Sequence, residues 1–140
     1  MALSAGSVYA QQRSCSSADA EKADQEAGSL RDWDALYRSW QRFGHCDDGS
    51  IGEGYSESVA RILVEHWEAL PKRSALSNSD LRFQKFVVRH IDATLDIADL
   101  RKIRTNARSH CLAQPKDLCK LVALAAERAL KENGIPISNK

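Results

Sequence analysis

The sequence predicts an all-α protein, a compact antiparallel bundle of about five helices that is stapled by disulfides. Apolar residues recur at intervals of three and four along almost the whole chain, which is the period of a helix with one buried face. All three prolines stand at predicted helix boundaries, and no alternating run of β-branched residues indicates a strand. A chain of 140 residues is long enough for one domain with a single core.

The N-terminal part of the chain predicts export. Residues 1–10 resemble the end of a secretory signal, with Val8-Tyr9-Ala10 as its cleavage site; the alternative is a disordered N-terminus. The even number of four cysteines favours export, because disulfides persist in oxidising compartments. We therefore expect a periplasmic protein. Residues 11–28 would form a polar arm (a short helix or disordered), 29–134 the helical domain and 135–140 a C-terminal tail.

Two aromatic-rich helices are predicted in the first half of the domain. The first covers 30–43: Ser29 followed by Asp32 resembles a capping box, and Gly44 is placed to end the helix. The second covers about 56–70 and stops before a proline. Their apolar faces are Leu30, Trp33, Leu36, Tyr37, Trp40 and Phe43, and Val59, Ile62, Leu63, Trp67 and Leu70.

Three further helices are predicted in the second half. The third begins after Asn78 or Ser79, the fourth after Asp92 or Asp96, and the fifth at Pro115, ending at the last glycine of the chain. Their inward residues are expected to be Phe83, Phe86, Val87, His90 and Ile91; Ile97, Leu100, Ile103 and Ala107; and Leu118, Leu121, Val122, Ala125, Ala129 and Leu130.

Charge is unevenly distributed along the chain. Residues 17–35 carry six acids against two bases, whereas 101–131 carry eight bases against two acids. We interpret these stretches as two solvated helix faces that attract each other. The net charge of +1 gives no overall field that favours nucleic acid or a membrane surface, so neither is an expected partner.

The cysteine positions suggest one pairing. Cys111 and Cys119 stand at the end of the fourth predicted helix and the start of the fifth, where a disulfide would staple the helical hairpin. Cys15 would then pair with Cys46 and tie the N-terminal arm to the middle of the chain. Four cysteines allow three connectivities, so this pairing is a preference.

Residues 44–54 are the most informative stretch. They contain four of the seven glycines and the carboxylates Asp47, Asp48 and Glu53, and they lie between the two aromatic helices. We interpret this stretch as a shaped loop, and such loops often carry function.

No pattern of residues indicates catalysis or metal binding. Residues 44–54 partly resemble an EF-hand loop, but Tyr55 stands where calcium needs a bidentate glutamate. Two pairs of neighbours, His45-Cys46 and His110-Cys111, lack the spacing of zinc ligands. No nucleophile elbow, P-loop or zinc-protease motif is found in the sequence. We therefore predict neither an enzyme nor a cofactor or metal site.

A family resemblance suggests a role. The stretch Phe43-Gly44-His45-Cys46-Asp47-Asp48-Gly49 and the spacing Cys111…Cys119, in a small exported helical protein, resemble the periplasmic immunity proteins of type VI secretion systems. The resemblance covers about residues 29–131. Members of this family neutralise peptidoglycan amidase effectors by inserting a protruding loop into the effector's cleft, where the loop blocks a Cys-His active site.

The resemblance implies that the partner is a secreted amidase effector and that residues 44–54 form the inserted loop. The expected partner-binding residues are His45, Asp47, Asp48, Ser50, Glu53 and Tyr55. The alternative hypothesis is an exported helical envelope protein of another role without enzymatic activity. Pairing into a homodimer is also left open.

Overall fold

The computed structural model describes residues 14–70, 80–111 and 116–137. Within these segments every regular element is a helix, six α-helices and three short 3₁₀-helices, so the all-α prediction is confirmed. None of the described helices is both long and apolar enough to span a membrane. The predicted signal remnant and the predicted helix starts at Asn78, Ser79 and Pro115 lie outside the described residues.

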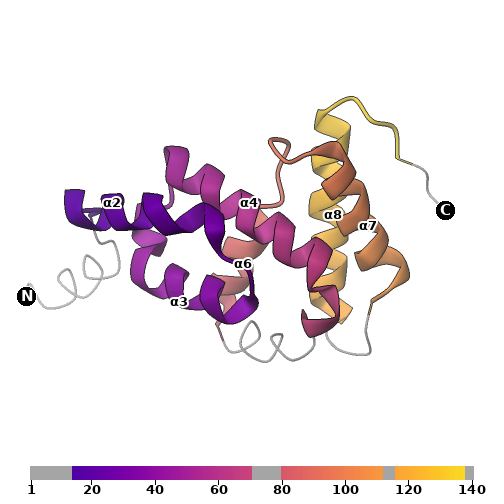
Figure 1. The fold of residues 1–140 in the computed structure, drawn as a ribbon. Helices are drawn as coiled ribbons and strands as arrows, with labels where there is room; N and C mark the ends of the chain where they lie inside the picture. Colours follow the sequence, from indigo (N-terminus) through magenta and orange to yellow (C-terminus); the bar gives the residue numbers. More distant parts are fainter. Residues whose placement is uncertain (1–13, 71–79, 112–115, 138–140) are drawn as a thin grey trace, which may run out of the picture.

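The helices form two groups that α4 connects. Helices α2 and α3 lie at one end of the molecule, α7 and α8 lie side by side at the other, and α4 runs between the two groups (Figure 1). The α-helices are α2 (Ser17–Glu26), α3 (Trp33–Phe43), α4 (Gly49–Glu65), α6 (Leu81–Arg89), α7 (Ile97–Ser109) and α8 (Lys116–Glu132). The 3₁₀-helices are η1 (Ala27–Ser29), η2 (Gly44–Cys46) and η3 (Trp67–Ala69).

Aspartates begin most of the helices. The side chain of Asp32 accepts a hydrogen bond from the backbone N–H of Ala35 at 2.8 Å, so α3 starts at Trp33 rather than after Ser29. Asp80 caps α6 and Asp96 caps α7 in the same way. Of the two predicted starts for the fourth helix, Asp96 is the one observed.

The polar N-terminal arm proves to be part of the helical domain. Residues 17–26 form α2, whose small side chains allow a close approach to α4: Ala23 and the adjoining Ala27 are fully buried. An ion pair of 3.0 Å joins Glu26 to Arg42 on α3. Helix α2 is thus packed against the helices that follow it in the chain.

Most of the predicted core faces are observed. The apolar residues of the second and third predicted helices are all buried, whereas Tyr37 and Trp40 of the first are only partly buried. The prediction for Leu121 is wrong: this side chain is 42% exposed on α8, as is its neighbour Leu124 at 41%.

Both predicted disulfides are present. Cys15 pairs with Cys46 across a Cα–Cα distance of 5.0 Å, and Cys111 pairs with Cys119 across 6.0 Å. The first bond fastens the start of α2 to η2, and the second joins the end of α7 to the start of α8. Two such bonds are typical of a protein from an oxidising compartment.

The acidic and basic stretches do not pair with each other among the described residues. Glu26 of the acidic stretch contacts Arg42, which lies outside the basic one. Within the basic stretch, Glu127 accepts hydrogen bonds from Arg104 at 2.9 Å and from Arg108 at 2.8 Å. The two stretches lie toward opposite ends of the molecule (Figure 1), and no ion pair between them is seen among the described residues.

The contacts of Glu127 with Arg104 and Arg108 predict a loss of stability in acid. The hydrogen bond from Arg108, supported by Arg104, lowers the pKa of Glu127 to about 2. A carboxyl group with a lowered pKa in the folded state contributes stability above its unfolded pKa, and this contribution is lost as the pH falls through the folded value. We expect the melting temperature of Glu127→Gln to lie below that of the wild type at neutral pH, and the difference to shrink between pH 4.5 and 2. A constant difference would contradict this assignment.

Candidate functional site

Residues 44–54 do not form a protruding loop. Gly44–Cys46 form η2, and α4 begins at Gly49, where the side chain of Asp48 accepts the backbone N–H at 2.9 Å. Only a short link separates the two helices. The loop predicted from the glycine density is therefore wrong, and most of it is the first turns of α4.

Two glycines of this stretch allow close packing, and a third adopts a backbone conformation that favours glycine. A Cβ atom on Gly54 would lie 2.9 Å from the backbone nitrogen of Gly28, so α4 and η1 approach closer than side chains allow. A Cβ on Gly44 would lie 2.9 Å from the indole ring of Trp40. Gly49 has a φ of +53°, a backbone conformation that favours glycine.

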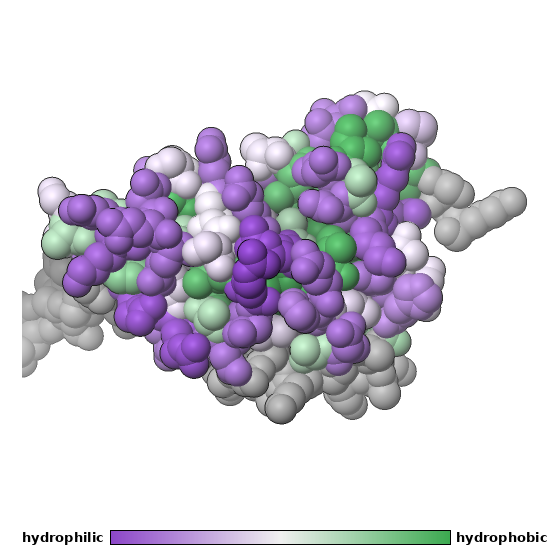
Figure 2. Space-filling view, in the orientation of Figure 1, coloured by the Kyte–Doolittle hydropathy of each residue, from purple (hydrophilic) through white to green (hydrophobic). Residues whose placement is uncertain are grey.

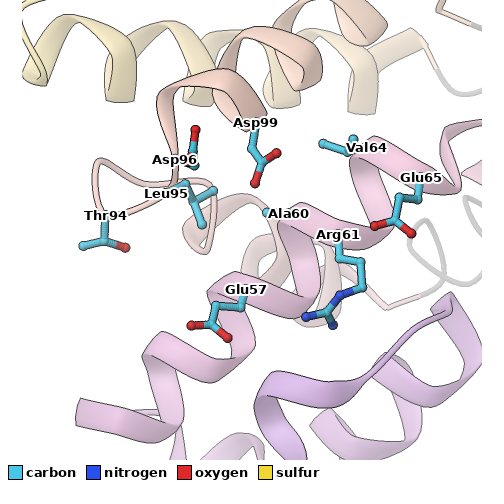
Figure 3. A pocket seen from close by; sticks show the side chains of 9 residues that line it. All are labelled: Glu57, Ala60, Arg61, Val64, Glu65, Thr94, Leu95, Asp96 and Asp99. Atoms are coloured by element: carbon cyan, nitrogen blue, oxygen red, sulfur yellow. The ribbon is translucent and has the colours of Figure 1, made fainter.

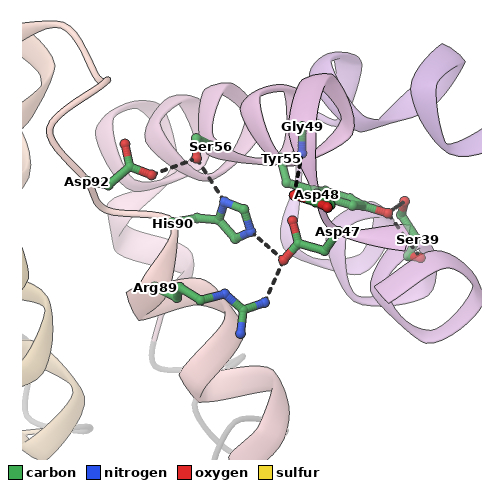
Figure 4. A network of polar contacts seen from close by, with 9 residues as sticks. All are labelled: Ser39, Asp47, Asp48, Gly49, Tyr55, Ser56, Arg89, His90 and Asp92. Atoms are coloured by element: carbon green, nitrogen blue, oxygen red, sulfur yellow. Dashed lines mark hydrogen bonds and ion pairs between the residues drawn. The ribbon is translucent and has the colours of Figure 1, made fainter. Parts of the chain in front are cut away.

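A buried polar network links the start of α4 to the end of α6 (Figure 4). His90 contacts Asp47 through Nε2 at 2.8 Å and Ser56 Oγ through Nδ1 at 2.8 Å. The Ser56 hydroxyl also lies 3.1 Å from Asp92, and Arg89 donates to Asp47 at 2.5 Å. The side chains of Asp47 and His90 are only 5% and 7% exposed.

The contacts of this network lower the pKa of Asp47. The Ser56 hydroxyl donates to Asp92, and its oxygen also lies beside Nδ1 of His90. Burial alone would raise the pKa of Asp47, but the hydrogen bonds and positive charges of His90 and Arg89 outweigh burial, and the pKa lies below its usual value. The network thus holds an ionised, buried carboxylate against the guanidinium of Arg89 and the ring of His90.

A serine, a histidine and an aspartate in one chain of hydrogen bonds invite comparison with hydrolases. In those enzymes the hydroxyl is exposed and its proton passes to the histidine. Here Ser56 is 3% exposed in the middle of α4, and its hydroxyl is directed to Asp92. This geometry fastens α4 to α6, with a surface pocket of about 280 Å³ above it. The sequence had suggested only that His90 is a core residue.

The predicted partner-binding residues divide into two groups. His45 bonds to Asp19 at 3.0 Å, and Tyr55 is fully buried with its hydroxyl 2.8 Å from Ser39 Oγ. Burial raises the pKa of Tyr55 to about 12. Together with Asp47, these two residues make contacts within the fold, and their side chains are largely buried. The three that remain exposed are Asp48, Ser50, which donates to Asp24 at 2.9 Å, and Glu53.

The exposed carboxylates continue along α4. Glu53 and Glu57 are exposed one turn apart, and neither has an ion pair or hydrogen bond to a described residue. The spacing of Glu53, Glu57, Arg61 and Glu65 at steps of four places all four along one side of the helix. This spacing is visible in the sequence, but the glycine-rich stretch 44–54 ends before Glu57 and does not include it. We call Glu53 and Glu57 the acidic face of α4.

A hollow of about 400 Å³ lies beside the acidic face, between α4 and the start of α7 (Figure 3). Glu57 and Glu65 border it from α4, and Asp96 and Asp99 from the other side. The pKa of Asp99 is raised mainly by burial, and further by the negative charges of Asp96 and Glu65. Arg61 is the base in the lining, and its guanidinium donates to the backbone carbonyls of Leu30 and Gly28. The hollow therefore carries an excess of negative charge.

Neither a search of the described residues for metal ligands nor a comparison with known proteins identifies a function. The described residues contain no group of three or more His, Cys, Asp or Glu side chains placed to hold a metal ion. No protein-family model matches the chain, and no curated protein or solved structure matches it significantly.

Proposed function

We propose that this protein is an exported inhibitor, an immunity protein that binds and blocks a peptidoglycan amidase effector of a type VI secretion system in the periplasm. The observation that carries the proposal is the acidic face of α4, whose Glu53 and Glu57 have no partner among the described residues. The two disulfides support the compartment, since they are typical of exported proteins.

The acidic face suits recognition of a positively charged rim. Its carboxylates are carried by a helix whose backbone is already ordered, so little backbone entropy is lost on binding. Hydrophilic side chains cover most of the side of the molecule that Figure 2 shows. An exposed carboxylate contributes little to folding, but its truncation costs about 2–5 kcal/mol of binding where it is buried against a basic partner. The residues bound by the partner thus shift from the predicted loop to one side of a helix.

The proposal is tested with purified protein and the type VI amidase effectors encoded in the same genome. We expect one effector to lose its peptidoglycan hydrolysis at an equimolar amount of this protein. The double variant Glu53→Lys with Glu57→Lys should bind that effector at least about tenfold more weakly, at an almost unchanged melting temperature.

A matched control separates the contact surface from total charge. Glu21→Lys with Glu68→Lys makes the same charge change at two exposed acids on α2 and η3, and should leave binding intact. If no amidase effector is inhibited, the role is wrong and another exported helical function applies. If both double variants bind alike, the acidic face of α4 is not the contact surface.

A further inference from the structure

The outer side of α8 carries apolar side chains that the fold leaves uncovered. Among the described residues three large hydrophobic side chains are exposed: Leu81, Leu121 and Leu124. Leu121 and Leu124 lie one turn apart on α8. Asp117 is exposed one turn before Leu121, and Arg128 is exposed one turn after Leu124. Neither charged residue has an ion pair to another described residue.

The spacing of these four residues is that of a coiled-coil seam. The intervals from Asp117 to Leu121, Leu124 and Arg128 are four, three and four, the alternation that keeps one stripe of a helix facing a partner helix. The opposite side of α8 is buried in the protein by Leu118, Val122, Ala125, Ala126 and Ala129. The stripe thus runs along the middle of the exposed side.

We propose that a second copy of this chain packs on this stripe, with the two α8 helices antiparallel about a twofold axis. An antiparallel alignment centred between Leu121 and Leu124 places each Leu121 opposite Leu124 of the second copy. The same alignment places each Asp117 opposite Arg128 of the second copy, so two leucine layers lie between two ion pairs. The surface is therefore complementary to itself, as an interface with twofold symmetry requires.

The charged residues favour an antiparallel over a parallel pairing of the two α8 helices. A parallel pairing would set Asp117 against Asp117 and Arg128 against Arg128, and like charges opposite each other are unfavourable. Within one helix the two residues are about 16 Å apart, too far to pair with each other. Both charges are therefore neutralised in the antiparallel dimer alone.

The surface that α8 offers to a second copy is small. Helix α8 has 17 residues and is about 25 Å long. A contact along one such helix lies at the small end of specific interfaces, which bury about 1,200 Å² or more. We expect a dimer of micromolar or weaker affinity that exchanges with the monomer.

Sedimentation velocity over a range of protein concentrations tests the proposal. The wild type should shift from monomer to dimer, and Leu121→Glu with Leu124→Glu should weaken association at least about tenfold while the helical circular dichroism is unchanged. The matched control is Leu81→Glu, which charges the third exposed leucine and should dimerise like the wild type.

Charge exchange tests the antiparallel register. Asp117→Arg alone and Arg128→Asp alone should each remain monomeric, since each places like charges opposite each other. An equimolar mixture of the two variants should form a heterodimer in which both pairs are again of opposite charge. A wild type that stays monomeric at every concentration would overturn the proposal, as would a mixture that does not associate. The outcome does not depend on inhibition of an amidase.

Discussion

Reduction of both disulfides should lower the free energy of unfolding by about 6 kcal/mol, the largest effect expected for this protein. The Cys15–Cys46 bond closes a loop with a sequence separation of 31 residues, and Cys111–Cys119 one of 8. Each bond restricts the unfolded chain, which raises the free energy of unfolding by about 4 kcal/mol for the first bond and about 2.5 kcal/mol for the second. Domains of this kind are stable by about 5–15 kcal/mol in total. The two bonds therefore contribute a large share of the total stability.

Urea denaturation of two double variants separates the contributions. Cys15→Ser with Cys46→Ser should lose more stability than Cys111→Ser with Cys119→Ser, because the longer loop restricts the unfolded chain more. Equal stability of the oxidised and reduced proteins would mean that the bonds are incidental to the fold. That result would also remove the main support for an oxidising compartment.

The helical faces were predictable because they depend on local spacing. The period of three and four that marks Val59, Ile62 and Leu63 as inward requires no knowledge of what they pack against. Helix starts were predictable to within a few residues, since aspartates such as Asp96 satisfy the first backbone N–H groups. The exposure of Leu121 was not predictable, because a wide apolar stripe does not reveal which of its edges faces the solvent.

The loop error has a physical cause in long-range packing. The density of glycine in 44–54 was interpreted as backbone freedom, yet Gly54 is required by a contact with Gly28, far away in sequence. Similarly, the polar composition of 17–26 concealed a helix that needs only the small Ala23 to pack closely. Glycine and alanine at close helix contacts give almost no signal of hydrophobic periodicity.

The same long-range contacts changed the interpretation of the carboxylates. In the sequence Asp47 and Asp48 are equivalent neighbours, and both were expected to contact a partner. In the structure Asp47 is buried against His90 of α6, whereas Asp48 is exposed and caps α4. The difference depends on where α6 packs, which no local pattern near residue 47 reveals.

Asp47→Ala should therefore destabilise the fold by about 3 kcal/mol. The substitution removes the carboxylate that accepts hydrogen bonds from His90 and Arg89, and leaves the buried ring of His90 without its partner. Removing one member of a buried charge pair typically costs about 3–5 kcal/mol, and the lower end applies because Arg89 is 62% exposed. Urea denaturation monitored by circular dichroism measures the change.

The neighbouring aspartate provides the matched control. Asp48→Ala removes an equal charge one residue away and should cost about 1 kcal/mol, the usual worth of an N-cap. The double variant Asp47→Ala with His90→Ala should lose less stability than the sum of the two single variants, because each removes the same contact. Equal, small losses for Asp47→Ala and Asp48→Ala would show that the network does not hold α4 to α6. If the expected difference is found, weak partner binding by Asp47→Ala reports unfolding, and only the exposed Glu53 and Glu57 can locate the contact surface.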